Sequence, residues 1–371
     1  MIADRPVGEP AEATLPPLYA PWLRAIAGGP IPAETVATCD RCVMLPSERG
    51  LPDAMFFLPE VKCCAYQPTL PGFLAGRILA DADPGMAHGR MALEKQIERR
   101  VGVAPHGVLS GAVFNLLFSL TPNVFGRSPA LKCPYLTDVG DCGVWRHRPG
   151  VCATWYCKHV RGEKGFRFWR LTDKLLRAVE SDLSIWCAAE MNTGSADLGN
   201  LDPQAPARPH VSELGGPLDV ARYRELWGEW EGREKEFYRA CAGLVEPLGW
   251  DEVLGICGPR VRVLAQLVRD AYEHLVSDAI PERLRLGSVG LASAAGGKYL
   301  VVSYSPYDPV MVPEQLVGVL RYFDGRPTED ALTAILSEGN LVVDLRLVRR
   351  MVDFGLLKAD EGAGPLALPA R

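Results

Sequence analysis

Apolar residues recur at helical spacing over most of this chain, so the pattern of hydrophobic and polar positions predicts a mainly α-helical fold. The expected helices cover residues 21–27, 70–78, 88–101, 166–191, 218–246 and 259–278. The helix over 166–191 is the clearest, because its apolar side chains share one face and Asn192-Thr193-Gly194 follows it as a stop signal. The last three helices together predict a bundle.

The pattern changes after residue 285. Residues 298–306 alternate in polarity and include β-branched side chains, which predicts a strand. Helical segments follow at 313–323, 328–337 and 344–354. Thr328 is the expected N-cap of the second of these, and Asp324-Gly325 is the expected turn before it. A strand followed by three helices is typical of a winged-helix-like module.

One stretch has to be tested as a membrane span, because no charged residue lies between His106 and Arg127. A spanning helix needs about 20 predominantly apolar residues. Asn115, Pro122 and several glycines interrupt this stretch, and the apolar run that remains has the length of a buried core helix. We therefore expect a core helix here and no membrane segment.

The fold class expected from these patterns is mainly α, with an irregular cysteine-rich metal-binding domain packed on a helical bundle and a small α+β winged-helix-like domain at the C-terminus. The expected parts are an N-terminal arm (1–30), the cysteine domain (31–165), the helical domain (166–284), the winged-helix-like module (285–360) and a disordered tail (361–371). The N-terminus has early acids and prolines and no apolar core of a signal peptide, which favours a cytoplasmic location.

Charge argues against a nucleic-acid partner. The chain has a formal net charge of −5, and residues 313–371 hold seven Lys or Arg against nine Asp or Glu. Nucleic-acid binding draws on a basic face. We therefore expect a peptide or protein partner, no nucleic acid and no membrane, and leave the oligomeric state open.

Cysteine is the most informative residue type in this chain. Eight of the eleven cysteines fall in the first 157 residues: Cys39, Cys42, Cys63, Cys64, Cys133, Cys142, Cys152 and Cys157. Without export, disulfides are not expected to persist, and an odd number of thiols also argues against them. Clustered thiolates need a compensating cation, which Zn²⁺ or an iron–sulfur cluster supplies with four sulfur ligands. These eight cysteines are the candidate metal ligands.

Two metal centres remain open at this point. Adjacent residues such as Cys63 and Cys64 tend to point apart, so they more easily serve different metal atoms than the same one. That spacing favours an iron–sulfur cluster, of the 4Fe–4S type, over a single zinc ion, which stays the alternative. Cys187, Cys241 and Cys257 lie on or beside apolar helix faces and are expected to be small core residues.

Basic residues flank the last cysteines and are candidates for contact with the centre or with an anionic ligand: Arg148, Lys158, His159 and Arg161. Cations near thiolates offset the negative charge of the site and raise the reduction potential of a cluster. Hydrogen bonding to sulfur is the simpler interpretation of the same residues. No residue type in the sequence identifies a catalytic group.

The cysteine pattern resembles the YkgJ-type cysteine-cluster family of zinc- or iron-chelating domains, a broad grouping that includes flagellin lysine N-methylases. The resemblance spans roughly residues 39–165, and the positions that match its second half are Cys133, Pro134, Leu136, Cys142, Arg148, Pro149, Cys152 and Cys157. Twenty residues separate Cys42 from Cys63, where the family has only a few. Whether Cys39 and Cys42 share a site with the other six therefore stays open. The resemblance implies a bound metal and no particular reaction.

The C-terminal segment 313–357 resembles the small PqqD-like or winged-helix modules that recognise a leader peptide. The residues that carry this resemblance are Leu316, Leu320, Asp324, Gly325, Thr328, Leu332, Leu336, Val348, Val352, Gly355, Leu356 and Leu357. The resemblance implies that a peptide docks on a strand edge of the module.

Three functions are compatible with the sequence. The first is a metal- or cluster-dependent enzyme, of oxidoreductase or methyltransferase type, that modifies a peptide or protein held by the C-terminal module. The second is a non-catalytic interaction protein with structural zinc. The third is a redox- or metal-sensing regulator. No dinucleotide-binding, P-loop, nucleophile-elbow or zincin motif is present, so in an enzyme the metal is the best candidate for the reactive centre.

Overall fold

The structure is a computed structural model that describes residues 8, 10–45, 55–100, 102–191, 219–294 and 296–360. The chain forms two compact units. We call Glu9–Trp155 with Trp169–Asp270 the cysteine unit, and Met1–Gly8 with Tyr156–Phe168 and Ala271–Arg371 the C-terminal unit. The division is coarser than the five parts expected from the sequence, and it assigns 156–168 to the C-terminal unit. The tail 361–371 lies outside the described residues.

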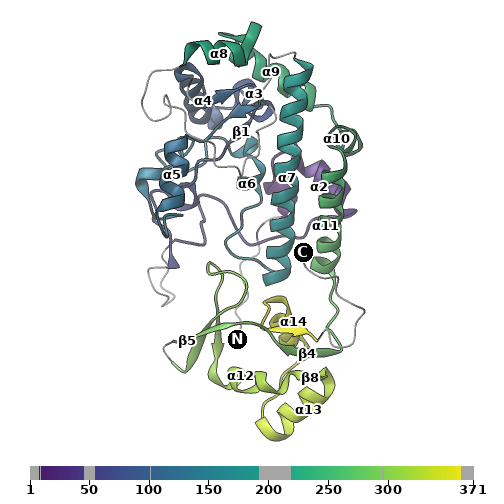
Figure 1. The fold of residues 1–371 in the computed structure, drawn as a ribbon. Coiled ribbons are helices and arrows are strands. Elements are labelled where there is room, and N and C mark those ends of the chain that lie inside the picture. Colours follow the sequence, from purple (N-terminus) through teal and green to yellow (C-terminus); the bar gives the residue numbers. More distant parts are fainter. Residues whose placement is uncertain are drawn as a thin grey trace. The chain divides into compact units, whose positions relative to one another are not determined.

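The described residues are mainly helical, as predicted, with small antiparallel sheets (Figure 1). The helices before residue 162 are α1 (Ala11–Thr14), α2 (Tyr19–Ala27), α3 (Gly72–Ala80), α4 (Ala87–Arg99), α5 (Ala112–Leu120) and α6 (Gly150–Ala153). Those from residue 162 to 276 are α7 (Gly162–Glu190), α8 (Val220–Trp227), α9 (Glu234–Val245), α10 (Trp250–Cys257) and α11 (Pro259–Val276). The strands β1 (Leu70–Pro71), β2 (Val103–Ala104) and β3 (Gly107–Val108) form a small sheet in the order β1-β3-β2.

The core of the cysteine unit is built on close contact between α3 and α9. A side chain at Gly76 would collide with the carbonyl oxygen of Tyr238, so glycine lets the two helices approach each other. Trp227 and Tyr238 are fully buried beside them, and the Tyr238 hydroxyl donates to the carbonyl oxygen of Ala104 at 2.8 Å. This contact ties the small sheet to the helices.

The prediction of one continuous helix over 218–246 is wrong. The structure has two helices here, α8 and α9, separated by a short 3-10 turn at Gly228–Trp230. Gly228 and Gly232 adopt positive φ angles of 53° and 81°, which interrupt regular helix. The apolar stripe seen in the sequence continues across the break, and for this reason periodicity alone did not show it.

Two further expectations for the cysteine unit are wrong. The N-terminal segment is not a surface arm from residue 11 onward, because Ala11, Leu15 and Leu18 are buried and the Trp22 indole donates to the carbonyl oxygen of Leu248 at 2.9 Å. The uncharged helix α5 is not a core helix, because its leucines are exposed. In the part of the chain that the structure describes, no helix is long and apolar enough to cross a membrane.

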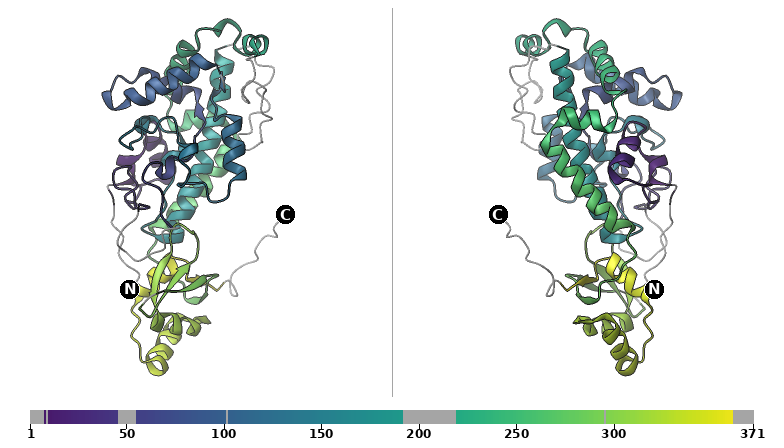
Figure 2. Two further views of the ribbon diagram at one scale, coloured as in Figure 1. Left: turned by 90° about the vertical axis from the view of Figure 1, so that its left-hand side faces the viewer. Right: turned by 90° about the vertical axis from the view of Figure 1, so that its right-hand side faces the viewer.

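The C-terminal unit contains the strand and the three helices that the sequence predicts, together with further strands that form two antiparallel sheets (Figure 2). One sheet has the order β5-β6-β7, and the other has the order β8-β4-β9. The strands are β4 (Arg283–Leu286), β5 (Gly290–Ala294), β6 (Lys298–Val302), β7 (Val310–Pro313), β8 (Asp324–Pro327) and β9 (Leu357–Ala359). The helices that begin here are α12 (Glu314–Val319), α13 (Thr328–Gly339) and α14 (Leu345–Asp353).

Local details of this unit differ from the prediction. Asp324 and Gly325 begin strand β8 and do not form a simple interhelical turn. Thr328 does not cap α13 with its side chain, because its hydroxyl donates to the carbonyl oxygen of Pro281 at 2.9 Å. Asp324, through strand β8, therefore pairs with strand β4, and Thr328 bonds to the segment that precedes β4.

Candidate metal centre

The candidate cysteines of the cysteine unit lie in short irregular segments that the helices hold in place. Cys63 and Cys64 belong to a 3-10 turn, and the backbone N–H of Cys133 donates to the carbonyl oxygen of Cys64 at 2.7 Å. Leu136 forms an isolated antiparallel bridge with Cys142. The first of these contacts joins segments that are about seventy residues apart in the chain, and the second closes a local loop around Cys142.

Two glycines fix the position of the cysteine segments on the helices. Gly89 of α4 lies so close to the carbonyl group of Gly143 that a Cβ atom would not fit, which places the segment after Cys142 against α4. Gly150 lies against Leu176 of α7 in the same way. The turn that carries Cys152 is therefore packed directly on α7.

Seven cysteines converge in this unit: Cys39, Cys42, Cys63, Cys64, Cys133, Cys142 and Cys152. They lie close enough for the charge on one thiolate to shift the pKa of others. Burial, followed by the charges of Cys142 and Cys63, raises the pKa of Cys39 to about 12. Burial also raises the pKa of Cys133 to about 12. Cys39 and Cys42, whose place was left open by the sequence, are thus gathered with the others.

Backbone N–H groups act on two of these thiols. Burial raises the pKa of Cys133 and Cys42, and the N–H groups of Tyr135, Leu136, Met44 and Leu45 oppose this rise. The N–H of Leu136 donates to the carbonyl oxygen of Cys133 at 3.1 Å, and the N–H of Leu45 donates to that of Cys42 at 3.2 Å. Hydrogen bonds to sulfur stabilise thiolates and tune metal centres. The backbone around Cys42 and Cys133 therefore favours negative charge on these sulfurs.

The orientation of Cys63 and Cys64 differs from the expectation. Their side chains are hydrogen-bonded to each other and do not point apart. This hydrogen bond lowers the pKa of Cys63 and raises that of Cys64. The argument from adjacency for a cluster over zinc therefore loses its geometric basis.

The eighth candidate, Cys157, belongs to the C-terminal unit. Within the described residues, no group of three or more His, Cys, Asp or Glu side chains is arranged to hold one metal ion. The structure thus brings seven predicted ligands into one region without common coordination geometry, and the ligand set remains a prediction.

Arg148 is the predicted cation that lies at the cysteines. Its guanidinium is buried, donates to the carbonyl oxygens of Trp145 at 2.8 Å and Thr14 at 2.6 Å, and lies 3.6 Å from the centroid of the Trp145 ring. Its charge lowers the pKa of Cys63 and Cys142 among other, larger influences. Arg148 therefore offsets thiolate charge, as the sequence suggested.

Lys62 has a similar role that the sequence reasoning missed. Its ammonium donates to the carbonyl oxygens of Cys39 at 2.5 Å and Gly140 at 3.0 Å. Burial raises the pKa of Cys42 and the charge of Lys62 opposes that rise, while the same charge contributes to the lowered pKa of Cys63. Its position directly before Cys63 was the available signal.

The other three predicted cofactor-binding residues, Lys158, His159 and Arg161, belong to the C-terminal unit. His159 is buried, its backbone N–H donates to Asp308 at 3.0 Å, and its Nδ1 lies 3.8 Å from the same carboxylate. Arg161 forms hydrogen bonds with Asp353 at 2.6 and 3.0 Å. These contacts give His159 and Arg161 structural partners within their own unit.

A polar stripe on α7 was also missed. Asp173, Arg177 and Glu180 follow one another at spacings of four and three residues, so they share a face of the helix. Arg177 binds Asp173 at 2.8 and 2.9 Å. Burial raises the pKa of Tyr66, and the charges of Arg177 and Cys152 act on it in opposite directions. The stripe and Tyr66 therefore lie beside Cys152.

Glu180 connects this stripe to the cysteine turn. Its Oε1 accepts hydrogen bonds from the Tyr19 hydroxyl at 2.5 Å and from the N–H of Gly150 at 2.6 Å. Burial raises its pKa to about 7 from 4.5. The spacing of these polar residues within an otherwise apolar face was the signal in the sequence.

Glu180→Gln is expected to remove a pH dependence of folding. In the folded protein Glu180 keeps its proton up to about pH 7, whereas in the unfolded chain it loses the proton above its ordinary pKa of 4.5. The free energy of unfolding therefore decreases as the pH rises from about 4.5 to about 7, by at most about 3 kcal/mol. Denaturant unfolding at several pH values, followed by tryptophan fluorescence, measures this slope. Glu190→Gln, at the exposed end of α7, should keep it. An unchanged slope in Glu180→Gln would contradict the assignment.

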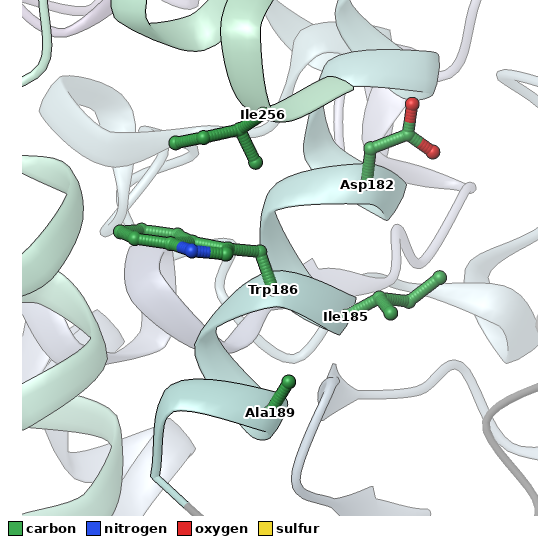
Figure 3. Close-up of a pocket in the computed structure, with 5 residues that line it drawn as sticks. All are labelled: Asp182, Ile185, Trp186, Ala189 and Ile256. Atoms are coloured by element: carbon green, nitrogen blue, oxygen red, sulfur yellow. The ribbon is translucent and has the colours of Figure 1, made fainter. Parts of the chain in front are cut away.

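A cavity of about 430 Å³ lies elsewhere on α7 (Figure 3). Asp182, Ile185, Trp186 and Ala189 line it from α7, and Ile256 lines it from α10. The Asp182 carboxylate is bound to Arg260 at 3.2 Å. The lining is mainly apolar and includes no cysteine, so the cavity is separate from the candidate centre.

Two of the three remaining cysteines have the expected structural character. Cys187 and Cys241 are almost fully buried, while Cys257 is partly exposed at the end of α10.

Comparison of the chain with known proteins found no matching family model, no similar curated protein and no similar solved structure.

Proposed function

We propose that this protein binds an iron–sulfur cluster through its clustered cysteines and modifies a peptide or protein substrate that the C-terminal module holds. The convergence of seven cysteines in one unit carries the proposal. Neighbouring buried thiolates repel one another, so this arrangement either keeps its protons or takes up a cation. Seven thiols also exceed the four ligands of a single zinc site.

The ligands of the cluster would come from these seven cysteines, with Cys157 as the eighth candidate. Arg148 and Lys62 would offset the charge of the thiolates, and the backbone N–H groups around Cys42 and Cys133 would stabilise them. A cluster of this kind supplies electron transfer at a potential set by such charges and hydrogen bonds. The resemblance to the YkgJ-type family is in keeping with this proposal.

A peptide-binding role of the C-terminal module is supported by its sheet. Strand β5 is at one edge of the β5-β6-β7 sheet, and its residues from Gly290 to Ser293 are exposed. An extended peptide can add a strand to such an edge, with main-chain hydrogen bonds providing affinity. The three helices α12, α13 and α14 follow the β5-β6-β7 sheet, with β8 between α12 and α13, and this order is compatible with the resemblance to PqqD-like modules.

Metal analysis of protein purified without oxygen tests the proposal. We expect iron and acid-labile sulfide in stoichiometric amounts, together with broad visible absorbance that bleaches on reduction. Colourless protein with one zinc per chain would instead support the non-catalytic alternative. Protein that contains neither metal after anaerobic preparation would contradict both interpretations.

A further inference from the structure

Helix α5 presents an apolar stripe to solvent. Val113, Leu116, Leu117 and Leu120 are 38%, 49%, 48% and 71% exposed. At 100° per residue these positions fall within an arc of about 100°, the width of the stripe that a helix normally turns toward a core. Polar Asn115 lies on another face, where it bonds to Ser110. The stripe therefore has the character of a contact surface.

The opposite side of α5 leads to the candidate metal centre. The rings of Phe118 and Phe114 lie 5.3 and 6.2 Å from the ring of Tyr66. Tyr66 in turn lies in the electrostatic surroundings of Cys152 and Arg177. These ring contacts therefore join α5 to the segment that carries Cys63 and Cys64, because Tyr66 follows Cys64 by two residues.

The size and charge of the stripe indicate which kind of molecule can bind it. A nine-residue helix is about 13 Å long and 10 Å wide, which is much smaller than the area of about 800 Å² that each chain contributes to a stable interface. Helices that lie in a membrane surface commonly carry Lys or Arg, and no charged residue lies between His106 and Arg127. A short amphipathic peptide binds by laying its own apolar face, with anchors at positions i, i+3, i+4 and i+7, on a hydrophobic surface of its partner.

We propose that α5 is a docking surface for an uncharged apolar segment of the peptide substrate, which it holds beside the cysteine centre. The inference rests on the proposed function and adds the substrate class at that site: a peptide with an apolar segment, bound through the side chains of Val113, Leu116, Leu117 and Leu120. The C-terminal module and α5 would then recognise different parts of the substrate.

Binding of a defined peptide to the anaerobically purified full chain tests this surface. The probe is a dye-labelled, uncharged synthetic helix with leucines at i, i+3, i+4 and i+7, and its serine-substituted counterpart is the control peptide. We expect the leucine peptide to bind and Leu117→Glu to weaken binding at least about tenfold. Val263→Glu, at a valine of α11 that is 62% exposed and belongs to neither proposed binding surface, should leave the affinity unchanged. A photoreactive leucine in the probe should crosslink to residues 112–120.

Three outcomes would contradict the proposal that α5 binds the peptide. The leucine peptide could bind Leu117→Glu as tightly as the parent protein, it could fail to bind the parent protein, or its crosslinks could map only outside α5. A dimer in sedimentation experiments that Leu117→Glu dissociates would assign the stripe to a second copy, and flotation with phosphatidylcholine vesicles that the same variant abolishes would assign it to lipid. Metal content is measured on the same samples: peptide docking without metal would reject the proposed function alone, and metal without docking would reject the surface alone.

Discussion

Replacing Cys152 by serine is expected to release the bound metal and to unfold the cysteine unit. Burial raises the pKa of the Cys152 thiol well above its ordinary value, and the charges of Cys133, Cys142 and Cys63 raise it further, so Cys152 is electrostatically coupled to three other candidate ligands. A serine hydroxyl is a poor substitute for a thiolate ligand. Structural zinc contributes about 10–16 kcal/mol to the folding of small domains, which is comparable to the whole stability of a typical domain, about 5–15 kcal/mol.

The experiment has a direct optical readout. All eight tryptophans of the chain belong to the cysteine unit, so tryptophan fluorescence reports on this unit alone. Metal content and fluorescence should both change in Cys152→Ser. In the control variant Cys257→Ser, at the end of α10, both should be retained. Normal metal content in Cys152→Ser would contradict its assignment as a ligand.

The sequence was informative where chemistry constrains position. The concentration of cysteines in the first half predicted a shared metal. The charges of Cys142 and Cys63 do add to the effect of burial on the pKa of Cys39 and Cys133, whereas the metal itself stays a prediction. In the C-terminal module, strand β6 and helices α12, α13 and α14 were predicted, because the alternation in 298–302 and the helical spacing after it are local signals. Strand β8, which lies between α12 and α13, and the other strands were not predicted.

The remainder depends on contacts between distant segments. Apolar periodicity identifies α5 as a helix but does not say whether its stripe meets a core or solvent. The buried pair of Tyr19 and Glu180 spans 161 residues, and nothing local to either residue indicates the other. The same holds for Arg161 and Asp353, which are 192 residues apart. Such pairs follow only from the tertiary arrangement.

Asp353→Ala is expected to destabilise the C-terminal unit by about 3–5 kcal/mol, because a buried carboxylate that three cations share is lost. Asp353 is 5% exposed and binds Arg161 at 2.6 Å, Lys164 at 3.1 Å and Arg349 at 3.3 Å. These cations come from the segment after Cys157 and from α14, so the carboxylate joins two parts of the unit. Without this carboxylate, the positive charges of Arg161, Lys164 and Arg349 repel one another while they remain partly buried.

Asp278 provides the matched control, because its carboxylate contacts the same Arg161 and Arg349 but is 87% exposed. Solvent screens an exposed pair, so Asp278→Ala should destabilise the unit far less than Asp353→Ala. The C-terminal unit has no tryptophan, so hydrogen exchange read by mass spectrometry over 156–168 and 345–353 measures its stability. Tryptophan fluorescence of the cysteine unit is the internal reference. Equal exchange in the two variants would mean that burial of Asp353 contributes nothing beyond a surface ion pair.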